Sequence, residues 1–184
     1  DVLFSCVDND AARLACALTA TTAHKVLLDV GTGIHDEPPP SPAHSLTRPP
    51  AHRGADIRLI IPGDGCLLCC GGVVNYEAAI QSLLQRNRSD GHGRELEWWE
   101  QRRGSLRSLN MIAAGMAVQL LQDLVTGRLQ RSVWLQVDWS ADDGLAVRTA
   151  SPPADRDRNC PLCLRSGMGS DGLRVPTSDT EKGR

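Results

Sequence analysis

The sequence predicts an α/β fold, in which a mostly parallel sheet is flanked by helices and followed by a C-terminal antiparallel hairpin. Three observations indicate this class. A strand, a helix and a strand follow one another at the start of the chain, two alternating segments surround a short turn near its end, and two C-x-x-C pairs lie far apart. The 184 residues suffice for one sizeable domain, which we expect over residues 1–164.

The first three elements form a βαβ unit. They are a strand over 1–7, "DVLFSCV", a helix over 8–23 and a strand over 25–31, "KVLLDVG". Both strands are nearly continuous apolar runs, typical of strands covered on both faces. The helix is rich in Ala and Leu, and Asp8 or Asn9 can cap it. We expect Gly31 and Gly33 to end the second strand, and the crossover implies parallel strands in a Rossmann-like sheet.

The middle of the chain contains a loop, a strand and two helices. Residues 36–54 are rich in proline, which excludes a helix or a central strand, and we expect an exposed loop there. A strand is predicted over 55–63, a short amphipathic helix over 75–87 and a longer helix over 105–127. Apolar residues of the longer helix fall three or four positions apart, and Gly127 closes it.

The end of the chain contains a hairpin and a polar tail. Residues 131–140 alternate like a half-exposed strand and can pair with 145–151 across a turn at Asp142, Asp143 and Gly144. Residues 165–184 are polar and rich in glycine, and we expect them to be disordered. Because an apolar strand begins directly at Asp1, we expect the chain to be a fragment that starts inside a fold.

Composition narrows the classes of function. The net charge of −2 gives no bulk electrostatic case for nucleic acid or an anionic membrane. We expect no membrane span, since Gln119, Gln122 and Asp123 interrupt the most apolar run, and no signal peptide. Seven cysteines are an odd number for a disulfide scheme, which favours a reducing, cytoplasmic setting.

The two C-x-x-C pairs are the strongest chemical signal. Together they supply four thiolates, the number that a tetrahedral structural zinc site needs, from Cys66, Cys69, Cys160 and Cys163. A self-contained zinc ribbon spaces its pairs by roughly 15 to 20 residues, so a metal here would clip distant parts of one fold. Two unrelated pairs without metal, or a thioredoxin-like redox pair, are the alternatives. The other three cysteines, Cys6, Cys16 and Cys70, are interpreted as buried small apolar residues, with a reactive role for Cys70 as an alternative.

Three blocks of sequence resemble the ThiF/MoeB/HesA family, the bacterial relatives of ubiquitin-activating enzymes. They are "CVDNDAARL", "LLDVGTGI" continuing to "ADIRLIIPGDGCLLC", and the late helix followed by the hairpin and "CPLC". The resemblance covers residues 1–163, and the widely separated cysteine knuckles are its most specific part. It implies an N-terminally truncated, incomplete Rossmann-like sheet with a pair of knuckles that together hold zinc through four cysteines.

The resemblance also implies an activity. Members of this family bind ATP and Mg²⁺ and adenylate the C-terminal glycine carboxylate of a ubiquitin-like or sulfur-carrier protein. By resemblance, Asp8 holds Mg²⁺ or the nucleotide at the end of its strand, Asn9 lies beside it, and Arg13 helps to orient the pocket. Without the resemblance, Asp8 is simply a helix cap. The relatives form dimers, so a homodimer is expected too.

Several departures from the family keep other interpretations open. The chain contains no G-x-G-x-x-G loop, Ala17 stands where the family often has an asparagine, and no cysteine lies between residues 71 and 159 to form a thioester. We therefore expect this fragment alone to be inactive. The main alternative is a non-enzymatic, zinc-stabilised module that binds a protein partner. A third is a Rossmann-like domain that binds another nucleotide and has accidental cysteine pairs.

Overall fold

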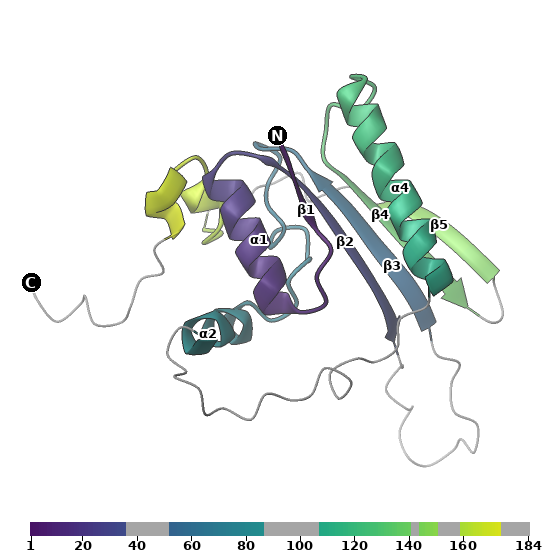
Figure 1. Cartoon of the computed structure of the whole chain (residues 1–184), viewed down its shortest axis with the longest axis horizontal. Helices are drawn as coiled ribbons and strands as arrows, with labels where there is room; N and C mark the ends of the chain where they lie inside the picture. Colours follow the sequence, from purple (N-terminus) through teal and green to yellow (C-terminus); the bar gives the residue numbers. More distant parts are fainter. Residues whose placement is uncertain (36–51, 87–106, 141–143, 151–158, 174–184) are drawn as a thin grey trace, which may run out of the picture.

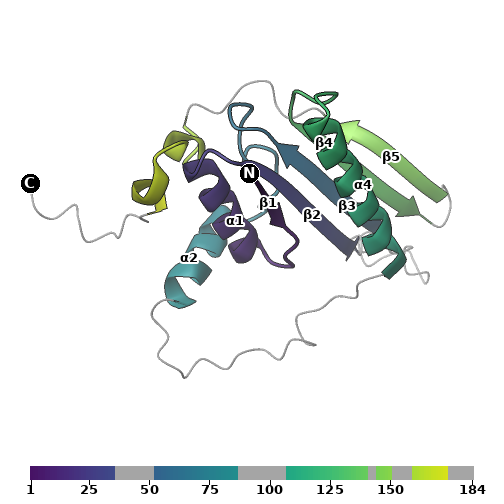
Figure 2. The same cartoon turned by 45° about the horizontal axis from the view of Figure 1, so that its top comes forward.

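The computed structural model describes residues 1–35, 52–86, 107–140, 144–150 and 159–173. Within these ranges the chain forms one five-stranded sheet with helices on both faces (Figures 1 and 2). The strands are β1 (Val2–Ser5), β2 (Val26–His35), β3 (His52–Ile60), β4 (Val133–Ser140) and β5 (Gly144–Ala150). The helices are α1 (Asp10–Thr22), α2 (Tyr76–Arg86) and α4 (Arg107–Val125), with short 3-10 turns η1 (Cys163–Arg165) and η2 (Gly169–Leu173).

The sheet is mixed, and its strands are ordered β1-β2-β3-β4-β5. The βαβ prediction is confirmed, because β1 and β2 run parallel on either side of α1 in the sequence. The prediction of a mostly parallel sheet is wrong, since β2–β3, β3–β4 and β4–β5 are all antiparallel. A parallel pair needs a crossover, usually a helix, whereas an antiparallel pair needs only a loop. The proline-rich sequence that connects β2 to β3 cannot supply such a helix.

Strand β2 continues past the glycines that were expected to end it. Gly31 and Gly33 both pair with β3, in the register Gly31↔Asp56 and Gly33↔Gly54. A Cβ at position 31 would collide with the guanidinium of Arg13. Gly31 therefore allows the Arg13 side chain to lie against the strand, and it does not act as a breaker.

The two faces of the sheet carry separate apolar cores, because side chains alternate along each strand. Leu27 and Ile60 face α1 and the cysteine knuckles, and they pack with Leu14, Ala17 and Ala20 of that helix. On the other face, residues of β2, β3 and β4 pack against α4: Leu28, Ala55, Ile57, Leu59 and Val137 meet Leu109, Ala113, Ala117 and Leu120. Figure 2 shows α1 and α4 separated by the sheet.

Helix α4 is the one described helix that is long and apolar enough to cross a bilayer, with a mean hydropathy of 1.2. Length and composition are weak evidence for a span, because core helices of globular proteins also meet them. Here α4 lies along the sheet and buries Leu109, Ala113, Ala117 and Leu120 against it. Of the apolar window of this helix, 22 % is buried.

The predicted bounds of the proline-rich loop and of the C-terminal tail are corrected by the structure, and the predicted late hairpin is confirmed. The expected loop over 36–54 is too long, because residues 52–54 already belong to β3, and residues 36–51 lie outside the described residues. The expected disordered tail, 165–184, begins too early. Gly167 N donates to Thr21 O over 3.1 Å, and η2 packs on α1. The late hairpin is confirmed as β4 and β5.

Candidate metal centre

The first cysteine knuckle is a tight turn that follows β3. Cys70 N donates to Cys66 O over 3.1 Å, and Gly72 N donates to Leu67 O over 2.8 Å. Gly63 and Gly65 before the turn have φ of 113° and 114°, a region that favours glycine. The "PGDG" sequence thereby reverses the chain, so that Cys66 and Leu67 are buried in the core beside α1.

The second knuckle repeats this geometry. Leu164 N donates to Cys160 O over 3.1 Å, in the same four-residue step as Cys70 and Cys66 in the first knuckle. Leu162, inside the turn, is 2 % exposed and packs in the same core as the first knuckle. Both turns are thus anchored by an apolar side chain between their cysteines.

The structure brings the four cysteines of the two knuckles into one cluster. Their sulfur atoms all lie within 4.8 Å of one another. Across the knuckles, the Sγ atoms of Cys66 and Cys160 are 3.5 Å apart, and those of Cys69 and Cys163 are 3.6 Å apart. The sulfur atoms of a tetrahedral zinc site with four thiolates, with bonds of about 2.3 Å, are separated by roughly 3.8 Å. The predicted set of four ligands therefore forms a cluster that could hold a metal ion.

The surroundings of the sulfur atoms oppose ionisation of two of the four thiols, those of Cys66 and Cys163. Burial raises the pKa of the Cys66 thiol, and it raises the pKa of Cys163 to about 12. At Cys160 burial acts in the same direction, yet hydrogen bonds from the Cys163 and Leu162 amides and from the neighbouring thiols leave its pKa below the usual value. A divalent cation would replace the remaining protons and neutralise the thiolates. Four thiolates suit zinc or iron.

The cluster joins the end of the described chain to the sheet and to α1. Residues that follow the second knuckle contact the C-terminal end of α1, where Gly172 lies so close to Thr22 that a Cβ would be 2.5 Å from its Cγ2. Arg165 Nη1 donates to Gly172 O over 2.9 Å and closes this segment on itself. A metal at the cluster would hold in place a segment that pairs with no strand among the described residues.

Asp8 and Asn9 follow β1 and are both exposed at the surface. They stand at the carboxyl end of the parallel β1–β2 pair, the edge at which open α/β sheets bind ligands. Asn9 is the cap of α1, since its side chain accepts a hydrogen bond from Ala12 N at 2.8 Å. Asp8 does not cap the helix, and its carboxylate accepts a hydrogen bond from Asn9 Nδ2 at 3.3 Å. The side chain of Asp8 is therefore accessible at this edge.

Replacing Asn9 with alanine should destabilise the protein by about 1 kcal/mol, because the amide of Ala12 loses its acceptor. Asn9→Asp keeps an acceptor and should restore most of the stability. Denaturant unfolding followed by circular dichroism measures the difference. The control is Asp8→Ala, which removes a neighbouring exposed side chain and should leave stability within about 0.5 kcal/mol of the parent. Equal losses in Asn9→Ala and Asp8→Ala would contradict the assignment of the cap.

Arg13 points into the fold. Its Nε lies 3.6 Å from Asp29 Oδ1, and its Nη1 donates to Gly72 O over 3.4 Å. It thus joins α1 to β2 and to the segment after the first knuckle. In this position Arg13 is occupied by internal partners, and its side chain is mostly buried.

Asp29 belongs to a buried ionic cluster that sequence reasoning missed. Ser5 Oγ donates to Asp29 Oδ1 over 2.8 Å, and Arg58 Nη1 lies 3.5 Å from Asp29 Oδ2. Arg58 also lies 3.4 Å from Asp56 Oδ2 and stacks over the Trp134 ring at 4.5 Å. Burial raises the pKa of Asp29, against the opposing effects of Arg13, Ser5 and Arg58. The signal that could have revealed this cluster is the presence of charges within two apolar strands, "LLDV" and "DIRLII".

Comparison with protein families and curated proteins yields no relative. No protein-family model matches the chain, and no curated protein matches it. The function of the chain is therefore inferred from the four-cysteine cluster, from the edge of the sheet at Asp8 and from the sequence resemblance.

Proposed function

We propose that this chain is part of an ATP-dependent adenylyltransferase that activates the C-terminal carboxylate of a ubiquitin-like or sulfur-carrier protein. The observation that carries the proposal is the combination of two features in one fold. An aspartate with an accessible carboxylate, Asp8, follows a parallel strand at the ligand-binding edge, and two distant C-x-x-C knuckles converge on one cluster. The resemblance to the ThiF/MoeB/HesA family rests on three blocks of sequence, which contain both features.

The chemistry explains the need for an acidic group at this edge. A carboxylate is a poor electrophile, and adenylation gives it AMP as a leaving group. Mg²⁺, when bound, neutralises the charge that builds on the phosphates. Asp8 is the residue that would hold this ion. Asn9 caps α1 directly beside Asp8, and its side-chain amide donates a hydrogen bond to the Asp8 carboxylate over 3.3 Å.

The four-cysteine cluster has a structural role in this proposal, with zinc as the ion. A catalytic zinc site keeps one position open for water or substrate, whereas four protein ligands close the site. Cys66 and Cys160 are 1 % and 3 % exposed, which fits a closed site.

The proposal predicts partner-dependent exchange of pyrophosphate into ATP. The assay uses the protein expressed from its complete reading frame, together with ubiquitin-like or sulfur-carrier proteins that end in glycine. Asp8→Ala should lower the exchange rate at least about 100-fold, in line with the loss of one electrostatic stabilising group, without loss of folding stability. Asp138→Ala, which removes a carboxylate on β4, the third strand along from β1 in the sheet, is the matched control and should leave the rate unchanged. Absence of exchange in a folded, metal-loaded parent protein would refute the proposal.

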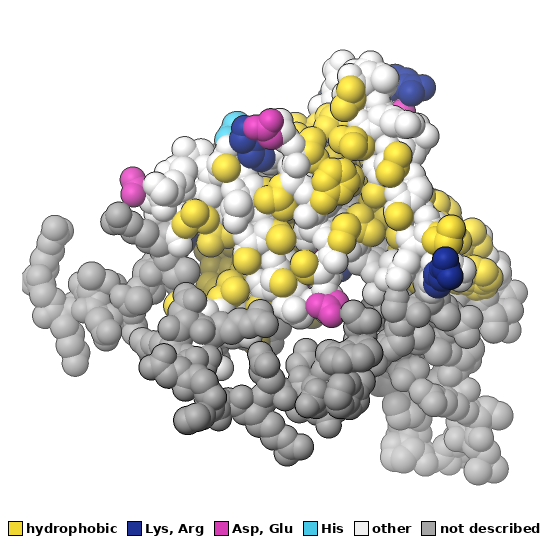
Figure 3. Space-filling view, viewed as in Figure 1, with side chains coloured by type: hydrophobic (Ala, Val, Ile, Leu, Met, Phe, Trp, Pro, Cys, Tyr) yellow, Lys and Arg dark blue, Asp and Glu magenta, His cyan; other side chains and the backbone are white. Residues whose placement is uncertain are grey.

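The second candidate is a non-enzymatic, metal-stabilised module that binds a protein partner. The observation in its favour is the outer side of α4, on which Met111, Val118 and Val125 are 66 %, 51 % and 77 % exposed. Figure 3 shows hydrophobic side chains gathered over this helix. Arg13 also favours this candidate, because its guanidinium is already occupied by Asp29 and Gly72. A folded protein without ATP exchange that still binds a ubiquitin-like protein would support it.

A further inference from the structure

We propose that the four-cysteine cluster is a redox-sensitive clasp, in which a hydroperoxide joins Cys69 to Cys163 in a disulfide and releases the metal. This inference depends on metal binding at the cluster and not on adenylation. It differs from a thioredoxin-like pair, because the disulfide would link the two knuckles and not the two cysteines of one C-x-x-C sequence.

Exposure separates the cysteines into two pairs. Cys66 and Cys160 are buried, whereas Cys69 and Cys163 are only partly buried. The partly buried pair has its sulfur atoms 3.6 Å apart, close enough to form a bond of about 2.05 Å after a modest side-chain rotation. An oxidant that arrives from solvent therefore meets two adjacent sulfur atoms, each from a different knuckle.

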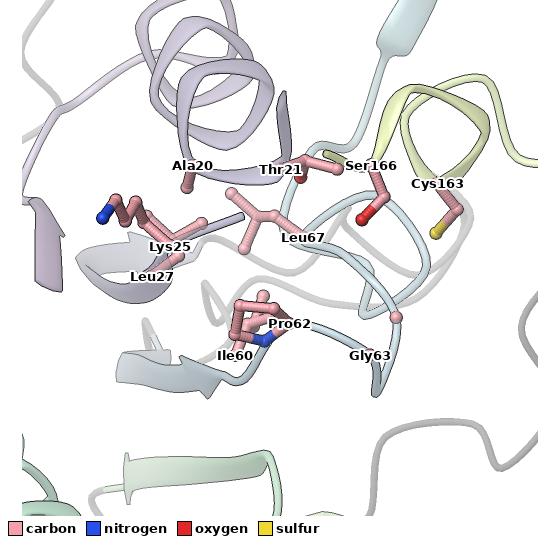
Figure 4. A pocket seen from close by; sticks show the side chains of 11 residues that line it. Ala20, Thr21, Lys25, Leu27, Ile60, Pro62, Gly63, Leu67, Cys163 and Ser166 are labelled. Carbon is pink, nitrogen blue, oxygen red and sulfur yellow. The ribbon is translucent and has the colours of Figure 1, made fainter. Parts of the chain in front are cut away.

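One of these two cysteines, Cys163, lines a small pocket. Cys163 lines the pocket together with Ser166 after η1, Thr21 in the last turn of α1 and Lys25 just before β2. Figure 4 shows Cys163 and Ser166 on one side of the pocket and Lys25 and Leu27 on the opposite side. Cys163 is thus both partly exposed and part of a pocket lining, so it is the first sulfur that we expect to be oxidised.

The chemistry is balanced with the peroxide as oxidant. The Cys163 thiolate attacks one peroxide oxygen, the O–O bond breaks, and the hydroxide that leaves takes up a proton as water. The Cys69 thiolate then attacks the sulfenic sulfur, the S–O bond breaks, and the hydroxide that leaves takes up a proton from solvent to form a second water. Two sulfur atoms are oxidised as one peroxide is reduced. Cys66 and Cys160 remain as two ligands, too few to retain the ion tightly.

The oxidised form would keep the late segment in place. A Cys69–Cys163 disulfide joins the same two knuckles that the metal joins, 94 residues apart along the chain. Reduction by a dithiol, followed by addition of metal, should therefore restore the starting state without refolding.

The test treats the metal-loaded chain with hydrogen peroxide. Metal release is followed with a chromogenic chelator, and disulfides are mapped by mass spectrometry of a non-reducing digest. We expect about one metal ion per chain to be released together with a Cys69–Cys163 linked peptide, as four thiolates bind a single ion. Links within a knuckle, Cys66–Cys69 or Cys160–Cys163, or release without any disulfide, would overturn the proposal.

Two matched variants separate the pairs while preserving a four-ligand site. Cys163→His removes one sulfur of the partly exposed pair. Peroxide should then release the metal at least about tenfold more slowly, because neither the Cys163 sulfenic acid nor the Cys69–Cys163 disulfide can form. Cys66→His removes one sulfur of the buried pair. This variant should still release its metal rapidly and form the Cys69–Cys163 disulfide. Equal release rates in the two variants would overturn the proposal. If either variant fails to bind metal, the disulfide map of the parent protein decides the outcome.

Discussion

Replacing Cys160 with alanine should abolish metal binding and lower the thermal stability of the protein by about 10 °C. A ligand that binds only the folded state at about a thousandfold its dissociation constant contributes about 4 kcal/mol, and a loss of about 1 kcal/mol shifts the midpoint by about 2–4 °C in a domain of this size. The Cys160 sulfur lies 3.5 Å from that of Cys66, so its loss leaves three ligands around the ion. Metal content by atomic emission and unfolding by calorimetry measure both effects.

Cys70→Ala is the matched control for this prediction. Cys70 is 3 % exposed and lies in the same core, but it is outside the four-cysteine cluster. The control should keep its metal and lose only the small packing contribution of a buried sulfur, about 1 kcal/mol. Similar losses of stability and metal in both variants would show that the cluster holds no structural ion.

The loss of metal should also be visible locally. Residues 166–173 contact α1 through Gly167 and Gly172, and they follow directly on the second knuckle. Amide hydrogen exchange in this segment and at the end of α1 should accelerate in Cys160→Ala, while the β2–β4 core keeps its protection. This pattern would distinguish loss of the metal link between the two knuckles from global unfolding.

The four-cysteine cluster was predictable from the sequence because its signal is local. Each C-x-x-C spacing favours a turn with two sulfur atoms on one side, and each turn carries a leucine that needs burial. What the sequence could not supply is the packing that brings Cys66 and Cys160 within 3.5 Å across 94 residues. That proximity depends on the position of α1, against which both knuckles pack.

The direction of the strands was harder to predict. An apolar run such as "DIRLII" is compatible with either a parallel or an antiparallel neighbour, since burial on both faces produces the same pattern. The proline-rich connection was the better evidence, because it excludes a crossover helix between β2 and β3. The last turn of the tail was missed for another reason: residues 165–173 are polar and rich in glycine, but contacts with Thr21 and Thr22 order them.

The ionic cluster of Arg58 was missed because its members are distant in sequence and each looks ordinary by itself. Arg58 is 3 % exposed and lies between two carboxylates, those of Asp29 and Asp56. Asp29 Oδ2 has no hydrogen-bond partner among the described residues, so the ion pairs of Asp29 with Arg58 and Arg13 offset the cost of its burial.

Arg58→Met should therefore destabilise the protein by about 3 kcal/mol at neutral pH, the lower end of the range for removing one partner of a buried ion pair, because Arg13 stays beside Asp29. Methionine retains much of the aliphatic volume against Trp134, so packing alone contributes little to this loss. Arg148→Met is the matched control, because Arg148 is exposed and pairs with Asp138 at 3.0 Å. Its loss should cost less than about 1 kcal/mol. Urea unfolding of both variants measures the difference.

Two further measurements test whether the Asp29 carboxylate, deprived of Arg58, causes this loss of stability. Adding Asp29→Asn to Arg58→Met should recover much of the stability, since it neutralises the buried charge.

Burial already raises the pKa of Asp29, and removal of Arg58 should raise it further. When the pKa of a carboxyl group is higher in the folded state than in the unfolded state, the group stabilises the fold at a pH below its unfolded-state pKa. This contribution is lost as the pH rises through its folded-state pKa. The deficit of Arg58→Met relative to the parent should thus shrink as the pH is lowered from neutral toward the unfolded-state pKa of aspartate, about 4. A deficit that is independent of pH, together with no rescue by Asp29→Asn, would assign the loss to packing instead.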